Sequence, residues 1–298
     1  MSSLQKSLTT FSGTALMMNM VVGAGLLSLP GLSVAAVGDH ALWAWALCVL
    51  LALPLIAVFV IMGRRYPNAG GVAHFAAQAF GSSAYAVSSL MFLGAVIFGL
   101  PAVALSGGHY AAELFALDPT IYATGFIILA TVAHLFHAKM VAKISTIIAS
   151  GVILALLGFV AVGMNAVPWH EETLPIAGVF EVDFVLVLSP FMMIFFAFTG
   201  WEVAAGSAEE FHHPKRDFPR AMVLSYVAVS ILYLAIVFIV QTAGVSESPV
   251  SAFAAIARAA VGDWGGVVMA LLACLMVFAN LFGMIWACLL YTSPSPRD

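Results

Sequence analysis

The chain has 298 residues, of which 63% are hydrophobic and only 8% are charged, and its formal net charge is -4. A soluble domain carries about 25% charged residues, so this composition excludes an ordinary soluble protein and predicts an integral membrane protein. Aromatic residues reach 12% and small residues are abundant, which favours closely packed membrane helices over a β-barrel. Basic residues form no stripe, so no nucleic-acid partner is expected.

Membrane spans follow from the apolar runs, because a helix needs about 20 apolar residues to cross the hydrocarbon core. No cleavable signal peptide precedes the first run, which is therefore expected to remain as a helix. The expected spans are residues 11–37, 42–62, 83–112, 120–136, 141–163, 185–208, 221–243 and 265–287. The sequence thus predicts an all-α, multi-pass protein of the lipid bilayer.

Lys and Arg set the expected orientation of these spans. With a cytoplasmic amino terminus, only Arg258 lies outside. The basic residues that lie inside are Lys6, Arg64, Arg65, Lys139, Lys143, Lys215, Arg216 and Arg220. This bias predicts a cytoplasmic amino terminus, with periplasm or extracellular space on the other side of the membrane.

Two connections between spans carry turn-forming residues. The stretch "YPNAGG", residues 66–71, is expected to make a re-entrant turn, because Gly and Asn favour turns. The stretch "PKRDFPRA", residues 214–221, is expected to be a cytoplasmic loop, with Pro214 ending the preceding helix.

The end of the chain is unusual. Residues 288–298 read "CLLYTSPSPRD" and resemble a translated sequencing adapter joined to a truncated reading frame; a disordered Ser/Pro tail is the alternative. We therefore expect one transmembrane domain over residues 1–287, cut after about eight helices, and a non-native tail over 288–298.

The first span contains residues that weaken helices. "NMVVGAGLLSLP", residues 19–30, includes Gly23, Gly25 and Pro30; in a helix interior Gly costs about 1 kcal/mol and Pro about 3 kcal/mol relative to Ala. A break inside the bilayer frees amide and carbonyl groups that protein, water or ligand must satisfy. The same glycines also suit close helix packing, so both interpretations stay open for this stretch alone.

The sixth span carries a second interruption. "FFAFTGWEVAAGSAEEF", residues 195–211, places Thr199, Gly200 and Glu202 inside it. A carboxylate within the membrane indicates a functional role unless it makes a structural hydrogen bond to a neighbouring helix. Five spans separate the two breaks, so these helices run in opposite directions, as expected of an inverted five-helix repeat with a site at the midplane.

Three stretches resemble the amino acid, polyamine and organocation transporter superfamily: "GAGLLSLP" at 23–30, "RRYPNAGGVAHFAAQAFG" at 64–81, and "FFAFTGWEVAAGSAEEFHHPKRDFPRA" at 195–221. With residues 41–67, they are most similar to bacterial exporters of methionine and branched-chain neutral amino acids. The resemblance implies the leucine-transporter-type fold, with a first repeat at about 11–163 and an incomplete second repeat at about 185–287, whose first and sixth helices are discontinuous.

The resemblance also implies a substrate site built mainly from the main chain. Amides at the start of a half-helix can hold an α-carboxylate, and freed carbonyls can accept hydrogen bonds from an α-ammonium. The residues implied are Gly23, Ala24 and Gly25 for the carboxylate, and Phe198, Thr199 and Gly200 for the ammonium.

The resemblance implies roles for four further side chains. Phe196 matches an aromatic gate over the substrate, with ordinary packing as the alternative. Glu202 matches a carboxylate of proton sensing or coupling. Asn280 and Lys143 fall in a region that holds a coupling cation in relatives, and Lys143 equally suits an interfacial position.

The expected function is secondary transport of a neutral amino acid, outward and coupled to protons or sodium, by alternating access. The alternative is a membrane receptor or assembly subunit that binds the amino acid without moving it. Neither is an enzyme. The cysteines and histidines lack metal-ligand spacing, so no metal and no cofactor are expected, and the oligomeric state stays open.

Overall fold

The computed structural model describes residues 8–133, 150–164, 182–243 and 249–292, apart from positions 24, 69 and 152. In these ranges every secondary-structure element is a helix, and the residues between helices include one isolated parallel bridge, between Leu8 and Phe211. Five helical stretches are long and apolar enough to cross a membrane: Gly25–Arg65, Ser82–Ala112, Phe184–Glu210, Pro214–Ala243 and Asp263–Phe282. The prediction of an all-α membrane protein is confirmed.

The first half of the chain starts with a broken helix and continues with longer ones. Its elements are α1 (Thr10–Val21), α2 (Gly25–Val37), the one-turn η1 (Gly38–His40), α3 (Ala41–Arg65), α4 (Gly71–Phe80) and α5 (Ser82–Ala112). Two shorter apolar helices follow, α6 (Pro119–Ala133) and the helix Ile153–Met164.

The second half again starts with a broken helix. Its elements are α8 (Phe184–Leu188), α9 (Phe191–Phe195), η4 (Phe196–Phe198), α10 (Trp201–Ala205), η5 (Gly206–Glu210), α11 (Pro214–Ala243), η6 (Pro249–Ser251), α12 (Ala252–Val261) and α13 (Asp263–Thr292). Both halves therefore contain, in order, a broken helix, a long helix, a ten-residue helix and a second long helix.

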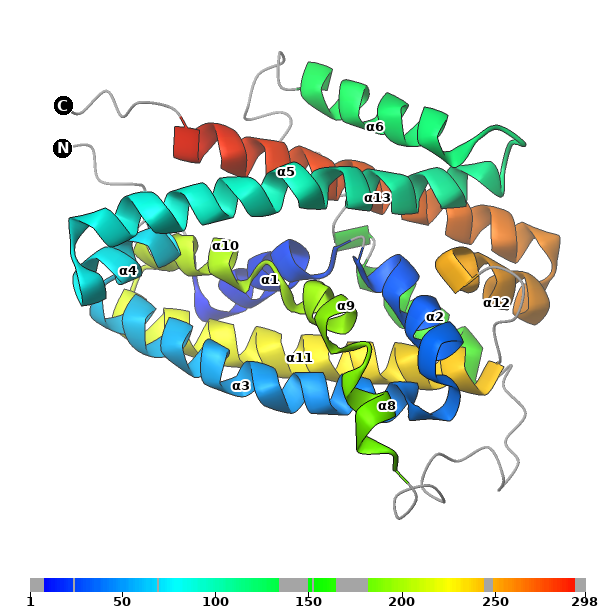
Figure 1. Ribbon diagram of the computed structural model, residues 1–298, viewed down its shortest axis with the longest axis horizontal. Helices are drawn as coiled ribbons and strands as arrows, with labels where there is room; N and C mark the ends of the chain where they lie inside the picture. The colour runs from blue at the N-terminus through cyan, green and yellow to red at the C-terminus, as the bar shows by residue number, and fades with distance from the viewer. Residues whose placement is uncertain are drawn as a thin grey trace.

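The two ten-residue helices end in the same way. A single glycine joins each to the next long helix, Gly81 between α4 and α5 and Gly262 between α12 and α13. Their φ angles are +92° and +83°, a region that Gly adopts without the steric cost of a Cβ. The amide of each donates back to its helix, to the Ala77 and Arg258 carbonyls at 2.9 Å. These two corners lie at opposite ends of the bundle (Figure 1).

The long helices form two layers around the broken ones. The helices α3 and α11 pack together on one side, and α5 and α13 on the other, with α6 outside them (Figure 1). The broken helices α1, α2, α9 and α10 lie between the layers.

Close approach between helices depends on glycines, because lipid tails are as apolar as the side chains and packing must supply the attraction. A Cβ on Gly107 of α5 would lie 2.6 Å from Val277 Cγ1 of α13. One on Gly163 would lie 2.7 Å from Ile239 Cγ2 of α11.

One expectation about a connection was wrong: "PKRDFPRA" forms the first turns of α11 instead of a loop. Pro214 begins α11, where its missing N–H costs nothing and its fixed φ suits a helix. A turn is present where "YPNAGG" predicts it, since the Gly71 amide donates to the Asn68 carbonyl at 3.1 Å, and the helix α4 follows. The helix α13 continues to Thr292, beyond residue 287, where the last expected span ends.

Candidate functional site

The first break lies where the glycines predict it. The helix α1 makes its last bond from the Val22 amide to the Met18 carbonyl at 2.8 Å, and Val22 then leaves the helical region with ψ +84°. The chain becomes helical again at Gly25, and the Leu26 amide donates to the Gly23 carbonyl at 3.1 Å. Pro30 lies inside α2, so the glycines and not the proline mark the break.

The second break also lies where it was predicted. After η4, Thr199 is extended with ψ +154°, and Gly200 has φ +112°. The Thr199 amide and hydroxyl both donate to the Phe196 carbonyl, at 3.2 and 2.7 Å. The new helix α10 starts at Trp201.

The two breaks touch each other. A Cβ on Gly200 would lie 2.8 Å from the Met20 carbonyl oxygen and 3.1 Å from Val21 Cα. Glycine is thus required at position 200 both for its positive φ and for the contact with α1. The contact brings the interruption of the second half against that of the first.

A tyrosine that the sequence did not single out joins the same two breaks. The hydroxyl of Tyr233 in α11 lies 2.9 Å from the Ala197 carbonyl and 3.2 Å from the Val21 carbonyl. In unbroken helices these carbonyls would accept from the amides four residues on. The fully buried Tyr233 therefore satisfies carbonyl groups that the breaks have freed.

Aromatic rings hold Tyr233 in place. Its ring packs edge-on against Trp45 and Phe198, with centroids 5.6 and 5.4 Å apart. The Trp45 indole donates to the Ser33 hydroxyl at 2.9 Å, which donates to the Pro30 carbonyl at 2.8 Å. A tyrosine inside an apolar span could have been singled out from the sequence, because its hydroxyl must find a hydrogen-bond partner within the membrane.

Glu202 bonds within its own break. The Gly200 amide donates to both carboxylate oxygens of Glu202, at 3.0 and 2.9 Å. The carboxylate thus satisfies an amide at the start of α10, where helix geometry leaves amides unpaired. The Glu202 carboxylate thus bonds to the main chain of its own break.

The remaining predicted residues divide between the break region and elsewhere. Phe196 lies beside Gly25: its Cδ1 is 3.4 Å from the place that a Cβ on Gly25 would take. Asn280 lies beside Gly23: its Nδ2 is 2.5 Å from the place that a Cβ on Gly23 would take. The Thr199 side chain is exposed, whereas Phe198 is buried in the core against Trp45. Ala24 and Lys143 lie outside the described residues.

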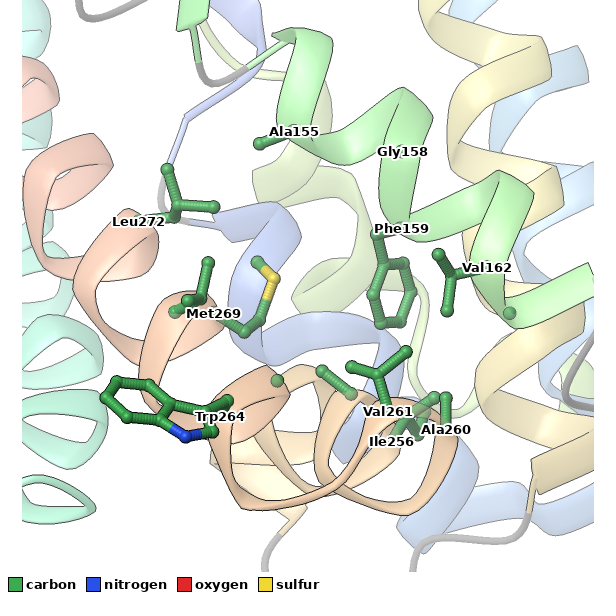
Figure 2. Close-up of a pocket in the computed structure, with 14 residues that line it drawn as sticks. Ala155, Gly158, Phe159, Val162, Ile256, Ala260, Val261, Trp264, Met269 and Leu272 are labelled. Atoms are coloured by element: carbon green, nitrogen blue, oxygen red, sulfur yellow. The ribbon is translucent and has the colours of Figure 1, made fainter.

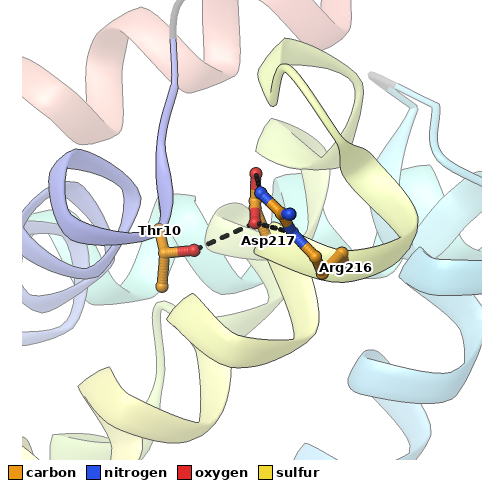
Figure 3. Close-up of polar contacts among 3 residues, drawn as sticks. All are labelled: Thr10, Arg216 and Asp217. Atoms are coloured by element: carbon orange, nitrogen blue, oxygen red, sulfur yellow. Dashed lines mark hydrogen bonds and ion pairs between the residues drawn. The ribbon is translucent and has the colours of Figure 1, made fainter.

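Polar clusters lie at both ends of the bundle. Near the start of α1, the Thr10 hydroxyl donates to Asp217 at 3.1 Å and Arg216 pairs with Asp217 at 2.8 Å (Figure 3), beside a hollow of about 430 Å³. Beyond α5, Glu113 accepts from the Ser251 hydroxyl at 2.8 Å and pairs with Arg258 at 3.3 Å.

The main chain strengthens the first of these clusters. The Leu8 amide donates to the Glu210 carbonyl and the His212 amide to the Leu8 carbonyl, both at 3.0 Å. The start of α1 is thereby tied to the segment that follows the second broken helix.

A second groove lies away from the breaks. It has a volume of about 390 Å³ and lies between the helix Ile153–Met164, α12 and the start of α13 (Figure 2). Its lining is apolar, with Phe159, Met269 and Trp264 among the larger side chains. None of the described residues that line it is charged, so they offer no partner to the two ends of a zwitterion, and the meeting of the two breaks is the candidate site.

Comparison with known proteins identifies the family. A family model described as amino acid permease matches residues 8–291. The chain belongs to the amino acid permease family. The expected membership in the amino acid, polyamine and organocation superfamily is therefore confirmed, and the family consists of transporters, not enzymes.

Relatives of this chain are named as transporters of amino acids or polyamines. It is 30% identical over 240 residues to the L-methionine/branched-chain amino acid exporter YjeH of Escherichia coli, covering 78% of this chain and 56% of the relative. It is 29% identical to the uncharacterized amino acid permease YecA of Bacillus subtilis, covering 95% and 67%. It is 26% identical to the putrescine transporter PotE of Escherichia coli, covering 74% and 51%. The chain thus spans about half to two thirds of the length of these relatives.

Proposed function

We propose that this permease moves a neutral amino acid of the methionine or branched-chain type out of the bacterial cytoplasm across the inner membrane, coupled to protons. The observation that carries the proposal is the contact between the two breaks at Gly200 and Met20. This contact supports a site in which amides freed at one break bind one end of an amino acid and carbonyls freed at the other break bind the other end.

In the proposed site, the amides at Gly23, Ala24 and Gly25 bind the α-carboxylate at the start of α2. The start of a helix favours negative charge. The α-ammonium is bound by main-chain oxygens near Phe198, Thr199 and Gly200, and Phe196 covers the substrate.

A neutral substrate is favoured over a cationic one. Relatives include both a methionine exporter and a putrescine transporter, so family membership alone leaves the charge open. The acidic side chain at the break, Glu202, has both oxygens bonded to the Gly200 amide. Because that carboxylate is already engaged, it is a poor partner for a second ammonium group.

The proposed fold is the leucine-transporter type, with inverted repeats at about 11–163 and 185–287 and a non-native tail over 288–298. The repeated order of elements and the corners at Gly81 and Gly262 support it. Alternating access would rock the broken helices against the long ones. The Asp217 cluster would close the cytoplasmic end and the Glu113 cluster the outer end.

Glu202 is proposed to couple transport to protons. Sodium is the alternative coupling ion, and Asn280 and Lys143 are proposed to lie in the region where it would bind. Asn280 lies against Gly23 at the first break, which supports a role for α13 in that region.

Counterflow tests the proposal against its alternative. The complete gene product, reconstituted in liposomes preloaded with unlabelled methionine, should accumulate labelled methionine or leucine. Saturable binding without any exchange would instead support a receptor or assembly subunit. Exchange of putrescine but not of methionine would overturn the neutral substrate.

A further inference from the structure

The helices α3 and α11 meet at one end of the bundle, where α3 ends and α11 begins (Figure 1). A Cβ on Gly63 of α3 would lie 2.3 Å from Phe218 Cε1 of α11, so these two helix ends are in direct contact. Five exposed basic side chains, half of the ten in the whole chain, form the basic end of the bundle: Arg64, Arg65, Lys215, Arg216 and Arg220.

Acidic side chains do not cancel this charge at the surface. Asp217, the acidic residue within the same turns, is only 4% exposed. Glu209 and Glu210 of η5, which packs against both helices, are half-buried. The exposed charge of the basic end is therefore predominantly positive, which favours a negatively charged partner.

Apolar side chains border the basic end on the same helix faces. Ile61 of α3, one turn before Arg65, is 60% exposed, and Leu224 of α11, one turn after Arg220, is 53% exposed. Residues four apart lie on one face of a helix, and both helices are long and apolar enough to cross a membrane. The outer surface thus changes from apolar to cationic within one turn on each helix, as a phospholipid changes from acyl chains to phosphate.

Arg216 connects this surface to the start of α1. Its Nε donates to one carboxylate oxygen of Asp217 at 2.8 Å and its Nη2 to the other at 3.4 Å (Figure 3), while its side chain is 60% exposed. Asp217 in turn accepts from the Thr10 hydroxyl of α1. Because a guanidinium has five N–H donors, the donors of Arg216 that Asp217 leaves free can bind an anion from outside.

We infer that the basic end binds the phosphate group of anionic phospholipids, and that the bound lipid stabilises the start of α1 through Arg216. The inference goes beyond the proposed function and does not depend on the transported substrate. A lipid fits this border better than a soluble phosphate, because its acyl chains cover Ile61 and Leu224 while its phosphate meets the basic side chains. In the proposed orientation this end faces the cytoplasm, so the partner is an anionic lipid of the inner leaflet.

Short-chain lipids in a nonionic detergent test the binding. The melting temperature of the complete gene product is titrated with dioctanoyl phosphatidylglycerol, dioctanoyl phosphatidylcholine or inorganic phosphate. Dioctanoyl phosphatidylglycerol should raise the melting temperature saturably, since a ligand that binds the folded state stabilises it, and the other two should not. An equal effect of the two lipids, or of inorganic phosphate, would overturn the inference.

The matched variants remove charge without touching the bond between Arg216 and Asp217. A basic side chain near anionic lipid contributes about fivefold in affinity, the equivalent of about 1 kcal/mol. The triple variant Arg64→Gln, Arg65→Gln, Arg220→Gln should therefore bind dioctanoyl phosphatidylglycerol about a hundredfold more weakly. Arg220→Lys, which keeps the charge, should bind as the parent does. A triple variant with the parent's affinity, or an equal loss in Arg220→Lys, would overturn the inference.

Hydrogen exchange tests the role of Arg216. Saturating dioctanoyl phosphatidylglycerol should slow exchange at the Leu8 and His212 amides, which tie the start of α1, about tenfold in the parent, the equivalent of one charge-assisted bond. The lipid should leave these amides unchanged in Arg216→Gln, which lacks the shared guanidinium. Lipid binding without slowing in the parent, or equal slowing in Arg216→Gln, would overturn this part of the inference.

Discussion

The Tyr233 hydroxyl donates a hydrogen bond to the Ala197 carbonyl across 2.9 Å, from the middle of α11 to the last turn before the second break. The same hydroxyl lies 3.2 Å from the Val21 carbonyl at the end of α1. A single side chain therefore stabilises both interruptions and keeps them in contact.

Replacing Tyr233 by Phe should lower thermal stability and weaken amino acid binding together. Loss of the hydroxyl leaves freed carbonyls unsatisfied inside the protein, at a cost of about 1–2 kcal/mol. Melting and binding isotherms in detergent measure both effects. The control is Tyr226→Phe, which removes a bond to the Val49 carbonyl of α3 and keeps the ring contact with Trp201 at the start of α10. Stability lost without any change in binding would show that Tyr233 has no part in the site.

Replacing Gly23 by Val should weaken substrate binding about tenfold or more while membrane insertion continues, the effect of losing one charge-assisted hydrogen bond to the carboxylate. A Cβ at this position would lie 2.5 Å from Asn280 Nδ2, so the Asn280 side chain must move aside. The control is Gly125→Val in α6, where a Cβ meets open space. Unchanged binding in Gly23→Val would refute the assignment of the carboxylate.

Replacing Glu202 by Gln should flatten the dependence of transport on pH. Glutamine keeps an oxygen that can accept from the Gly200 amide, so the break keeps its hydrogen bond, but it carries no titrating proton. Counterflow rates of parent and variant are compared across pH 5 to 8. Parallel profiles would leave Glu202 as a structural residue of the break.

Replacing Asp217 by Asn should loosen the start of α1. The change removes the ion pair with Arg216 and the charged acceptor of Thr10. Hydrogen exchange at the Leu8 and His212 amides should accelerate about tenfold, the equivalent of one charge-assisted bond. Glu113→Gln, at the other end of the bundle, should accelerate exchange near Ser251 and leave Leu8 unchanged. Acceleration at both ends in either variant would show that the clusters are not independent.

Replacing Thr120 by Val should weaken the start of α6 at neutral pH, and its effect should diminish as the pH falls below about 4. The Thr120 hydroxyl and amide hold the pKa of Asp118 below its usual range, the amide donating at 2.8 Å. A lowered pKa means that the ionised form stabilises the fold, and this contribution is lost as pH falls through the folded pKa. Hydrogen exchange in the first turn of α6 at pH 7 and pH 3 checks this, and an equal effect at both values would contradict it.

The sequence predicted the breaks well because their cause is local. Gly200 has the positive φ that glycine adopts readily, and Gly23 and Gly25 are poor helix formers, so the positions of the breaks can be read from the residues. Tyr233 could not be found in this way, since its partners lie 36 and 212 positions away along the chain. Which tyrosine reaches a freed carbonyl depends on how α11 packs.

The connecting helices were missed for a different reason. A search for runs of about 20 apolar residues passes over α4 and α12, which have ten residues each. Pro214 was interpreted as a helix end although proline is equally at home in the first turn. Local residue preferences left both possibilities open there, and the packing of Phe218 against Gly63 fixes the start of α11 beside α3.

The corners at Gly81 and Gly262 leave no slack between neighbouring helices. A loop of several residues would absorb a displacement of α12, whereas a joint of one residue passes the displacement on to α13. Asn280 and Met284 lie on α13, more than four turns after Gly262. A shift of α12 therefore moves the part of α13 that contacts the first break at Gly23.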